Sequence, residues 1–374
     1  MRTIQNSKLF RIYKNPSNGV ESFILSEHIA SVQKNFYYTN PGMTEDGRFL
    51  WFMCCNPNSS EDGNFSIACV DIEKDKILSF PETEAKTPAP MLDSKNGFLY
   101  WTNGLDIWRR SNSPEEKHEK VNSFPESLVK GRKLERIATH LSLSANQKSL
   151  SIDAIIGNDS YIGEMPINGS EFILWEEIKG KFHDHALFNP TQENIILFAH
   201  EFWVDHKNET FDGNRKYHRM WLIKKGEKSS PVLNEPISHS GHEWWSANGN
   251  FIYYVHYGIG VKKVHLSTRQ EKNIWPSPLA HAHSSTDDNY LVADQMDNPI
   301  FSQCSVIFKN LKTEKEIIIS EIPALPKFVP KCKHLHPHPQ FCHNNQYICY
   351  TTTVFGRVDI ALCPVRQLLE KTSI

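Results

Sequence analysis

A repeat of about 50 residues runs through the chain and limits its fold more than any other feature. Each unit opens with a polar turn, and a short apolar strand follows the turn. These strands lie at 49–52, 98–101, 150–152, 195–198, 251–255, 290–293 and 347–350. Seven such units at the blade length of β-propellers predict an all-β, seven-bladed β-propeller with four-stranded antiparallel blades.

Five of the units carry a histidine four residues ahead of the turn. They are His140, His185, His242, His281 and His338. In a propeller the first strand of every blade lines the central channel, so equivalent positions on these strands face one shared space. The sequence therefore predicts a channel rich in imidazole groups.

The propeller is expected to occupy residues 1–374 as a single domain, because closed all-β rings run long without splitting. The last unit supplies only three strands, and the segment 21–26 is expected to add the missing outer strand and close the ring. The polar stretch 109–133 is expected to be a surface loop. A second long connection, 206–218, is expected to carry substrate contacts.

The formal net charge is -2 and the charged residues are scattered. This pattern indicates neither a nucleic-acid partner nor a membrane, and no obligate protein partner is indicated. The start of the sequence has no apolar leader, which favours a cytoplasmic location. The eight cysteines form no CxxC pair and are expected to be buried reduced thiols.

A metal site is predicted from the histidines of the last two units. His336 and His338 project to one face of a strand, His334 follows the same alternation, and His281 lies at the same depth of the adjacent blade. A His-x-His pair facing solvent is the simpler alternative. Imidazole-rich ligation favours a divalent transition metal over Ca or Mg, and we place Mn first, with Zn, Ni, Co and Fe as alternatives.

Catalytic groups are predicted beside this site. His242 is a candidate general base, because the pKa of imidazole lies near neutrality, although a core histidine bonded to backbone is the alternative. Arg219 can grip a carboxylate with two parallel hydrogen bonds, although it can also be a solvated strand edge. Further candidates for substrate binding are His185, Glu201, Arg215 and Lys333.

Several motifs of the chain resemble those of the oligogalacturonate lyases, cytoplasmic seven-bladed propellers that cleave short pectin fragments by β-elimination with a divalent metal. The motifs are Arg219-Met-Trp, His242-Glu-Trp-Trp and His336-Pro-His-Pro, and the similarity runs over nearly the whole chain. The resemblance implies that His242 abstracts a proton and that Arg219 assists at the reacting uronate. It also implies a metal on His281, His336 and His338, and a small anionic oligosaccharide as substrate.

One position departs from the family pattern. A glutamine ligand of the family stands three residues before the first histidine of His-Pro-His, and this chain has Lys333 there. An ammonium group has no lone pair to donate, so His334, His283 or water takes its place, or the site has another task. A different uronate, from rhamnogalacturonan, glucuronan or ulvan, stays open. The alternative from another class is a non-catalytic propeller that binds a metal or an anionic sugar as a sensor or scaffold.

Overall fold

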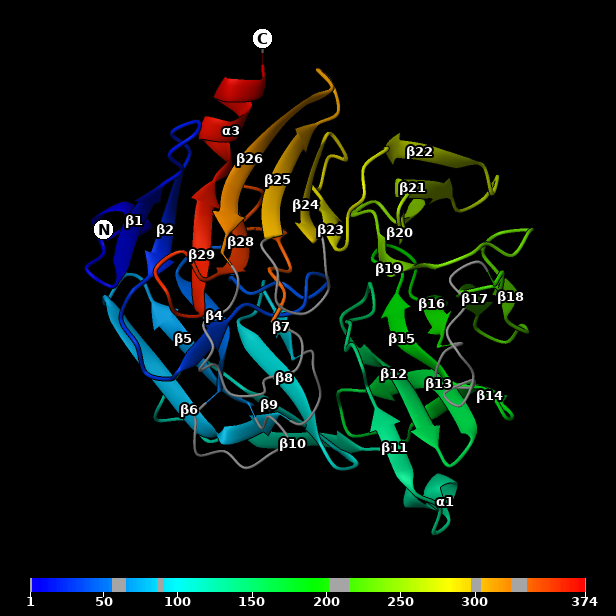
Figure 1. Ribbon diagram of the computed structural model, residues 1–374. Helices are drawn as coiled ribbons and strands as arrows, with labels where there is room; N and C mark the ends of the chain where they lie inside the picture. Colours follow the sequence, from blue (N-terminus) through cyan, green and yellow to red (C-terminus); the bar gives the residue numbers. More distant parts are fainter. Residues whose placement is uncertain are drawn as a thin grey trace.

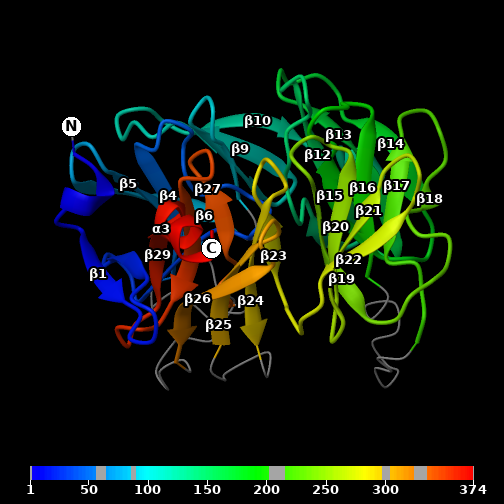
Figure 2. The same ribbon diagram turned by 90° about the horizontal axis from the view of Figure 1, so that it is seen from above.

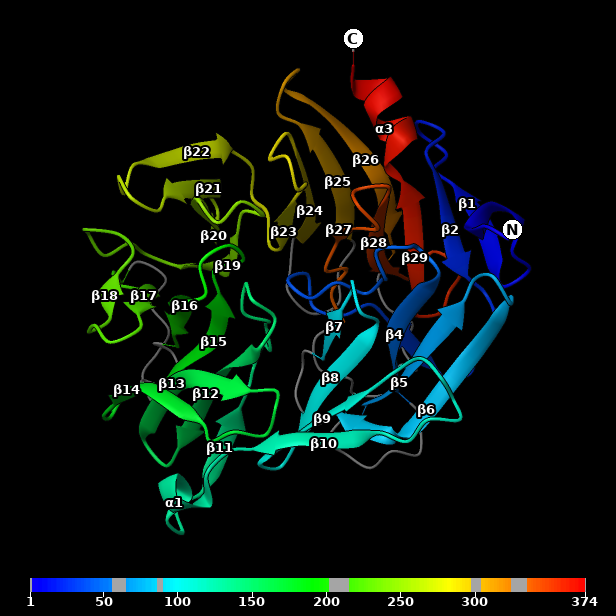
Figure 3. The same ribbon diagram turned by 180° about the vertical axis from the view of Figure 1, so that it is seen from behind.

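Seven antiparallel sheets form a ring around a common centre (Figure 1). The computed structural model describes residues 2–55, 65–85, 90–201, 215–296, 304–323 and 335–373. Within these residues six sheets have four strands and one has five. The view from behind shows the same order of sheets around the ring (Figure 3). The all-β, seven-bladed fold predicted from the repeat is confirmed.

The blades are numbered here in chain order. Blade 1 comprises β3 (Val32–Lys34), β4 (Phe49–Cys55), β5 (Phe65–Asp71) and β6 (Lys76–Ala85). Blade 2 comprises β7 (Met91–Asp93), β8 (Phe98–Asn103), β9 (Asp106–Arg110) and β10 (Glu119–Ser123). Blade 3 comprises β11 (Leu134–Ile137), β12 (Ser149–Ile156), β13 (Asp159–Pro166) and β14 (Ile173–Ile178). Blade 4 comprises β15 (His183–Phe188), β16 (Ile195–His200), β17 (Met220–Lys224) and β18 (Ser230–Pro231).

The remaining blades complete the ring. Blade 5 comprises β19 (Ser240–Trp245), β20 (Phe251–His256), β21 (Gly260–His265) and β22 (Glu271–Trp275). Blade 6 comprises β23 (Ala282–Ser284), β24 (Tyr290–Met296), β25 (Cys304–Asn310) and β26 (Lys315–Ile322). Blade 7 comprises β27 (Gln340–Cys342), β28 (Tyr347–Thr352), β29 (Asp359–Pro364), β2 (Glu21–Leu25) and β1 (Phe10–Lys14).

Blade 7 joins the two ends of the chain. Phe23 and Ile24 of β2 pair with Leu362 and Ala361 of β29, where the sequence predicts the additional strand. Blade 7 has one strand more than the four predicted, because β1 forms a hairpin with β2 and adds a fifth. Arg11, Ile12 and Lys14 of β1 are exposed, as suits an outer edge strand, whose far side faces water.

The stretch 109–133 is not the loop expected from its polarity. It contains β10, which pairs with β9, and the short helix α1 (Glu126–Val129). Arg109 forms an ion pair with Glu119 across the two strands, and the buried Phe124 anchors the turn that follows β10. A blade's outer strand has one open edge, so it can be polar along its length.

Helices are few in the described residues. They are η1 (Ile4–Asn6), α1 and α3 (Val365–Thr372), and α3 lies beside β25 and β26 (Figure 2). None of them combines the length and the apolar character that a membrane-spanning helix needs.

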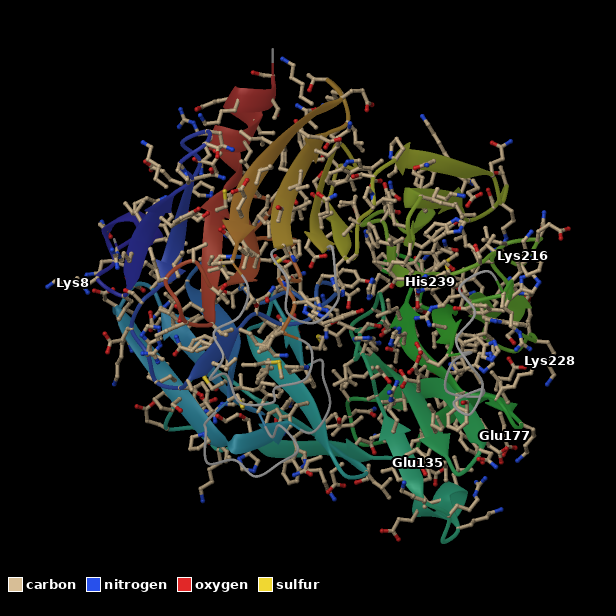
Figure 4. All side chains as sticks on the ribbon, in the orientation of Figure 1. Lys8, Glu135, Glu177, Lys216, Lys228 and His239 are labelled. Atoms are coloured by element: carbon tan, nitrogen blue, oxygen red, sulfur yellow. The ribbon has the colours of Figure 1, made fainter. Side chains whose placement is uncertain are left out.

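The core lies between neighbouring blades. All seven residues of β4 are buried, as a strand covered by a blade on each face requires. One cluster joins Leu25 and Leu362 of blade 7 to Leu50 of blade 1. Charged side chains such as Lys8, Glu177 and Lys228 project from the outside of the ring (Figure 4). The packed blades therefore hold the inner strands at fixed positions around the channel.

Candidate metal and catalytic site in the central channel

The backbone of the inner strands turns three of the predicted histidines in an uncommon way. His185, His242 and His338 have φ angles of 57°, 53° and 44°. Few residues other than glycine adopt this left-handed conformation, and they cluster at functional sites. The pairing register also shifts across His185 and across His242, which marks β-bulges. A bulge re-aims side chains, so residues next to a channel histidine can also face the channel.

The five predicted histidines come together around one tyrosine. Tyr37, which follows β3, stacks on His140 with the ring centroids 4.4 Å apart, and its ring lies 4.9 Å from that of His338. His185 lies 4.4 Å from His140 on one side of this group. On the other side, the ring of His281 lies 4.3 Å from that of His338 and 3.9 Å from that of His242. The rings thus form one continuous group supplied by six blades.

The residues predicted to bind a metal have suitable geometry. One ligand atom from each of His281, His336 and His338 lies within 4.8 Å of the other two. Nδ1 of His281 lies 3.0 Å from Oδ2 of Asp294, and the backbone N–H of His338 donates to the same oxygen at 3.3 Å. A carboxylate on Nδ1 fixes the tautomer and leaves Nε2 as the ligand atom. Three imidazole donors with this support fit a divalent transition metal.

His242 has one ring nitrogen available as a base. Its Nδ1 donates to the carbonyl oxygen of Ala280, so Nε2 carries the lone pair. The hydroxyl of Tyr257 lies 2.9 Å from Nδ1 and 3.4 Å from Nε2. A Cβ on Gly241 would lie 2.9 Å from that hydroxyl, so glycine permits the approach. Burial and the nearby His281 hold the pKa of His242 well below its usual value, which keeps the ring neutral.

Arg219 is buried and firmly held, not a solvated strand edge. Its Nη1 donates to Oε1 of Glu201 at 2.8 Å. Its Nη2 and Nε contact the two carboxylate oxygens of Glu243 at 3.3 and 3.4 Å. Burial alone would raise the pKa of Glu243, but Arg219 and His185 hold it well below the usual range. Two carboxylates therefore fix the orientation of the guanidinium.

His185 lies among acidic groups in the same network. Its Nδ1 is 3.4 Å from Glu243, and its Nε2 is 3.7 Å from Asp184 and 3.9 Å from Glu201. Burial alone would lower the pKa of His185, but Asp184, Glu243 and Glu201 raise it to about 9. Arg136 forms an ion pair with Asp184 on the other side.

Some predicted residues are not gathered here. Nδ1 of His283 accepts the backbone N–H of Phe341 at 3.1 Å, so its other nitrogen carries a proton and cannot ligate a metal. Arg215 is exposed ahead of β17. Lys333 and His334 lie outside the described residues, as does most of the connection 206–218.

Sequence reasoning missed five residues of the site. These are Tyr37, Asp184, Glu243, Tyr257 and Asp294. Asp184 and Glu243 each adjoin a channel histidine in the sequence. Neighbours in a regular strand face opposite sides, so this position would have identified them only if the bulges had been foreseen.

Comparison with known proteins adds a family context. No family model matches the chain. The oligogalacturonide lyase of Pectobacterium atrosepticum is 26% identical over 202 residues, which cover 48% of this chain and 49% of that protein. The oligogalacturonate lyase of Dickeya dadantii is 25% identical over 202 residues, with the same coverage. Both relatives are named as lyases. They support the family that the motifs resemble, and the chain spans about half the length of these curated relatives.

A solved structure agrees with the fold over almost the whole chain. An oligogalacturonate lyase in complex with manganese superposes with a TM-score of 0.74 and covers 95% of this chain and 96% of its own. Its sequence is 17% identical, so the likeness bears on the propeller fold alone.

Proposed function

We propose that this protein is a metal-dependent polysaccharide lyase that cleaves short oligouronides by β-elimination. The observation that carries the proposal is the position of His242. Its neutral ring, with Nε2 as the lone-pair nitrogen, lies 3.9 Å from the ring of His281, the first of three converging histidines. A base beside a cation site is the arrangement that removal of a proton next to a carboxylate requires.

The chemistry follows from the uronate itself. The C5–H bond must break, and its acidity rises when the adjacent carboxylate is neutralised. A divalent cation on His281, His336 and His338 would neutralise that carboxylate. His242 takes the proton at Nε2, the electron pair forms the C4–C5 double bond, and the C4–O bond breaks as the leaving oxygen gains a proton. Arg219, oriented by Glu201 and Glu243, assists by stabilising negative charge at the reacting uronate.

Oligogalacturonate is the first substrate to test, and manganese is the first metal. The two curated relatives are named for this substrate, and the solved structure with the same fold holds manganese. Three imidazole donors also suit zinc, nickel, cobalt and iron, which remain alternatives. Uronates from rhamnogalacturonan, glucuronan and ulvan complete the set of candidate substrates.

A panel of these oligouronides tests the proposal. The protein, supplied with manganese, should release a product with the ultraviolet absorbance of an unsaturated uronate from at least one of them. The summed mass of the products should equal that of the substrate. Products heavier by one water would indicate hydrolysis. Saturable binding of every sugar without a product would favour the non-catalytic binder.

A further inference from the structure

Blade 4 holds a second group of metal-ligand side chains, separate from the three histidines. It consists of Asp184, His185 and Glu201, with one ligand atom of each within 4.8 Å of the others. Nε2 of His185 lies 3.7 Å from Oδ1 of Asp184 and 3.9 Å from Oε1 of Glu201. Hydrogen bonds of this kind are about 2.7–3.2 Å long, so neither contact is one. Two ligand atoms that each lie about 2.0–2.2 Å from the same metal ion are roughly 3–3.6 Å apart. The distances from Nε2 of His185 to the two carboxylate oxygens are within a few tenths of an ångström of that spacing.

Buried polar atoms at this group support a ligand independently. Asp184 is 0% exposed, and its Oδ1 has no hydrogen-bond partner among the described residues. His140 is 3% exposed, its ring contacts that of His185, and its Nδ1 also has no such partner in the described part of the chain. Buried polar atoms are rarely left without a partner in folded proteins, and a bound ion is one explanation.

The charges of the group call for a dication. The described residues that interact here include four carboxylates and two guanidinium groups, namely Asp153, Asp184, Glu201, Glu243, Arg136 and Arg219. A bound metal ion displaces protons from its ligands, and with His185 neutral and Asp184 ionised these six groups carry two net negative charges in a buried place. Buried charge is costly unless it is paired, and one divalent cation cancels this excess.

The two arginines leave the ligand atoms accessible to an ion. Arg136 pairs with Oδ2 of Asp184, so Oδ1 remains. Arg219 takes one lone pair of Glu201 Oε1, and a carboxylate oxygen has a second. Nδ1 of His185 lies 3.4 Å from Oε1 of Glu243 and 3.3 Å from Nη2 of Arg219. In the metal-bound ring Glu243 accepts the proton on Nδ1, and the lone pair is on Nε2.

We propose that Asp184, His185 and Glu201 bind a second divalent first-row transition-metal ion. Two carboxylates and one imidazole form a mixed oxygen and nitrogen donor set, for which Mn²⁺ is a suitable probe. The ion would link β15 to the residue that follows β16, in the wall of the channel beside Arg219. This inference does not depend on the proposed lyase activity.

Counting bound metal tests the proposal. The protein is stripped with a chelator, titrated with Mn²⁺ in a calorimeter, passed through a desalting column and submitted to elemental analysis. The parent should bind two equivalents. Glu201→Gln and His185→Asn should each bind one. Asparagine is chosen because it tolerates the φ of 57° at position 185. His336→Ala should also bind one, and His336→Ala combined with Glu201→Gln should bind none.

A matched control is Glu164→Gln, which changes a buried carboxylate on β13 paired with Lys225 and should keep both ions. Circular dichroism establishes that each variant is folded. A single parent ion that is lost only in the blade 4 variants supports this site and contradicts the histidine site. No parent ion, one ion lost only in His336→Ala, or two ions retained in both blade 4 variants would overturn the proposal. A parent count of zero overturns the proposal even if no variant folds, and absent lyase activity leaves the counts unchanged.

Discussion

At His242, one hydrogen bond decides which ring nitrogen can accept a proton. The carbonyl of Ala280 can only accept, so it holds the proton on Nδ1 and leaves the lone pair on Nε2. The αL backbone and the bulge then set where the ring points. The hydrogen bond, the left-handed backbone and the bulge together make the lone pair of Nε2 available.

The first prediction concerns this base. His242→Ala should lower turnover by roughly a hundredfold or more, the scale of a lost general base, while the metal content stays at the parent level. Initial rates of unsaturated product and elemental analysis measure the two effects. His265→Ala, in the same blade and away from the channel rings, is the control and should keep the parent rate. Parent-level turnover in His242→Ala would place the base elsewhere.

The second prediction concerns the guanidinium. Arg219→Lys should lower activity by roughly tenfold or more, because an ammonium keeps the charge but cannot span Glu201 and Glu243 with a planar fork. The comparison of kcat with KM shows whether the loss arises in the reaction or in substrate binding. Activity equal to the parent would mean that charge alone is required at this position.

The third prediction concerns the carboxylate behind the metal ligands. Asp294 supports His281 and His338 from two different blades. Asp294→Asn should weaken Mn²⁺ binding at the histidine site by about 10–100-fold, the usual effect of losing such a support. Asp287→Asn changes an exposed carboxylate in the turn of the same blade and serves as the control. Equal affinities in the two variants would show that Asp294 does not tune the site.

Among the elements, the hairpin of β1 and β2 depends on its inner strand. Leu25 of β2 is fully buried in the cluster between blades 7 and 1, whereas Ile12 of β1 is 52% exposed. The fourth prediction is that Leu25→Ala lowers the free energy of unfolding by about 2–5 kcal/mol, through lost burial and a cavity. Ile12→Ala should change it by no more than about 0.5 kcal/mol. Denaturant titrations measure both, and equal losses would contradict this assignment of the two strands.

The sequence predicts the middle strands of the blades better than the outer ones. Middle strands such as β4 and β16 are covered on both faces, so they are largely apolar runs between turns. Outer strands such as β10 have a polar composition that resembles a loop, and three of the five residues of β1 are exposed. The pairing of an outer strand depends on its neighbour in space. β1 pairs with β2, and β2 joins a blade whose other strands come from the opposite end of the chain.

The histidines of the site were predictable and most of their partners were not. The repeat places His140, His185, His242, His281 and His338 at equivalent positions, and periodicity is visible in one sequence. Asp184 and Glu243 face the same network only because bulges interrupt the alternation of their strands. A bulge leaves no regular pattern from which it could be recognised.

For the whole molecule, the ring gathers residues that are far apart in the sequence. Tyr37 comes from blade 1 and His338 from blade 7, yet their rings lie 4.9 Å apart. The site therefore requires the closed ring, in which blade 7 contains strands from both ends of the chain (Figure 1). Single channel residues add little to the interblade core, so variants at the ligands should fold.

We propose that the channel as a whole carries out a metal-dependent elimination. The most direct measurement follows the ultraviolet absorbance of unsaturated uronate when chelator-stripped protein receives a short oligogalacturonate, before and after Mn²⁺ is added. This metal dependence predicts no product from stripped parent protein, rapid product formation once Mn²⁺ is restored, and none from His336→Ala under either condition. Product formation at the same rate with and without the metal would contradict it.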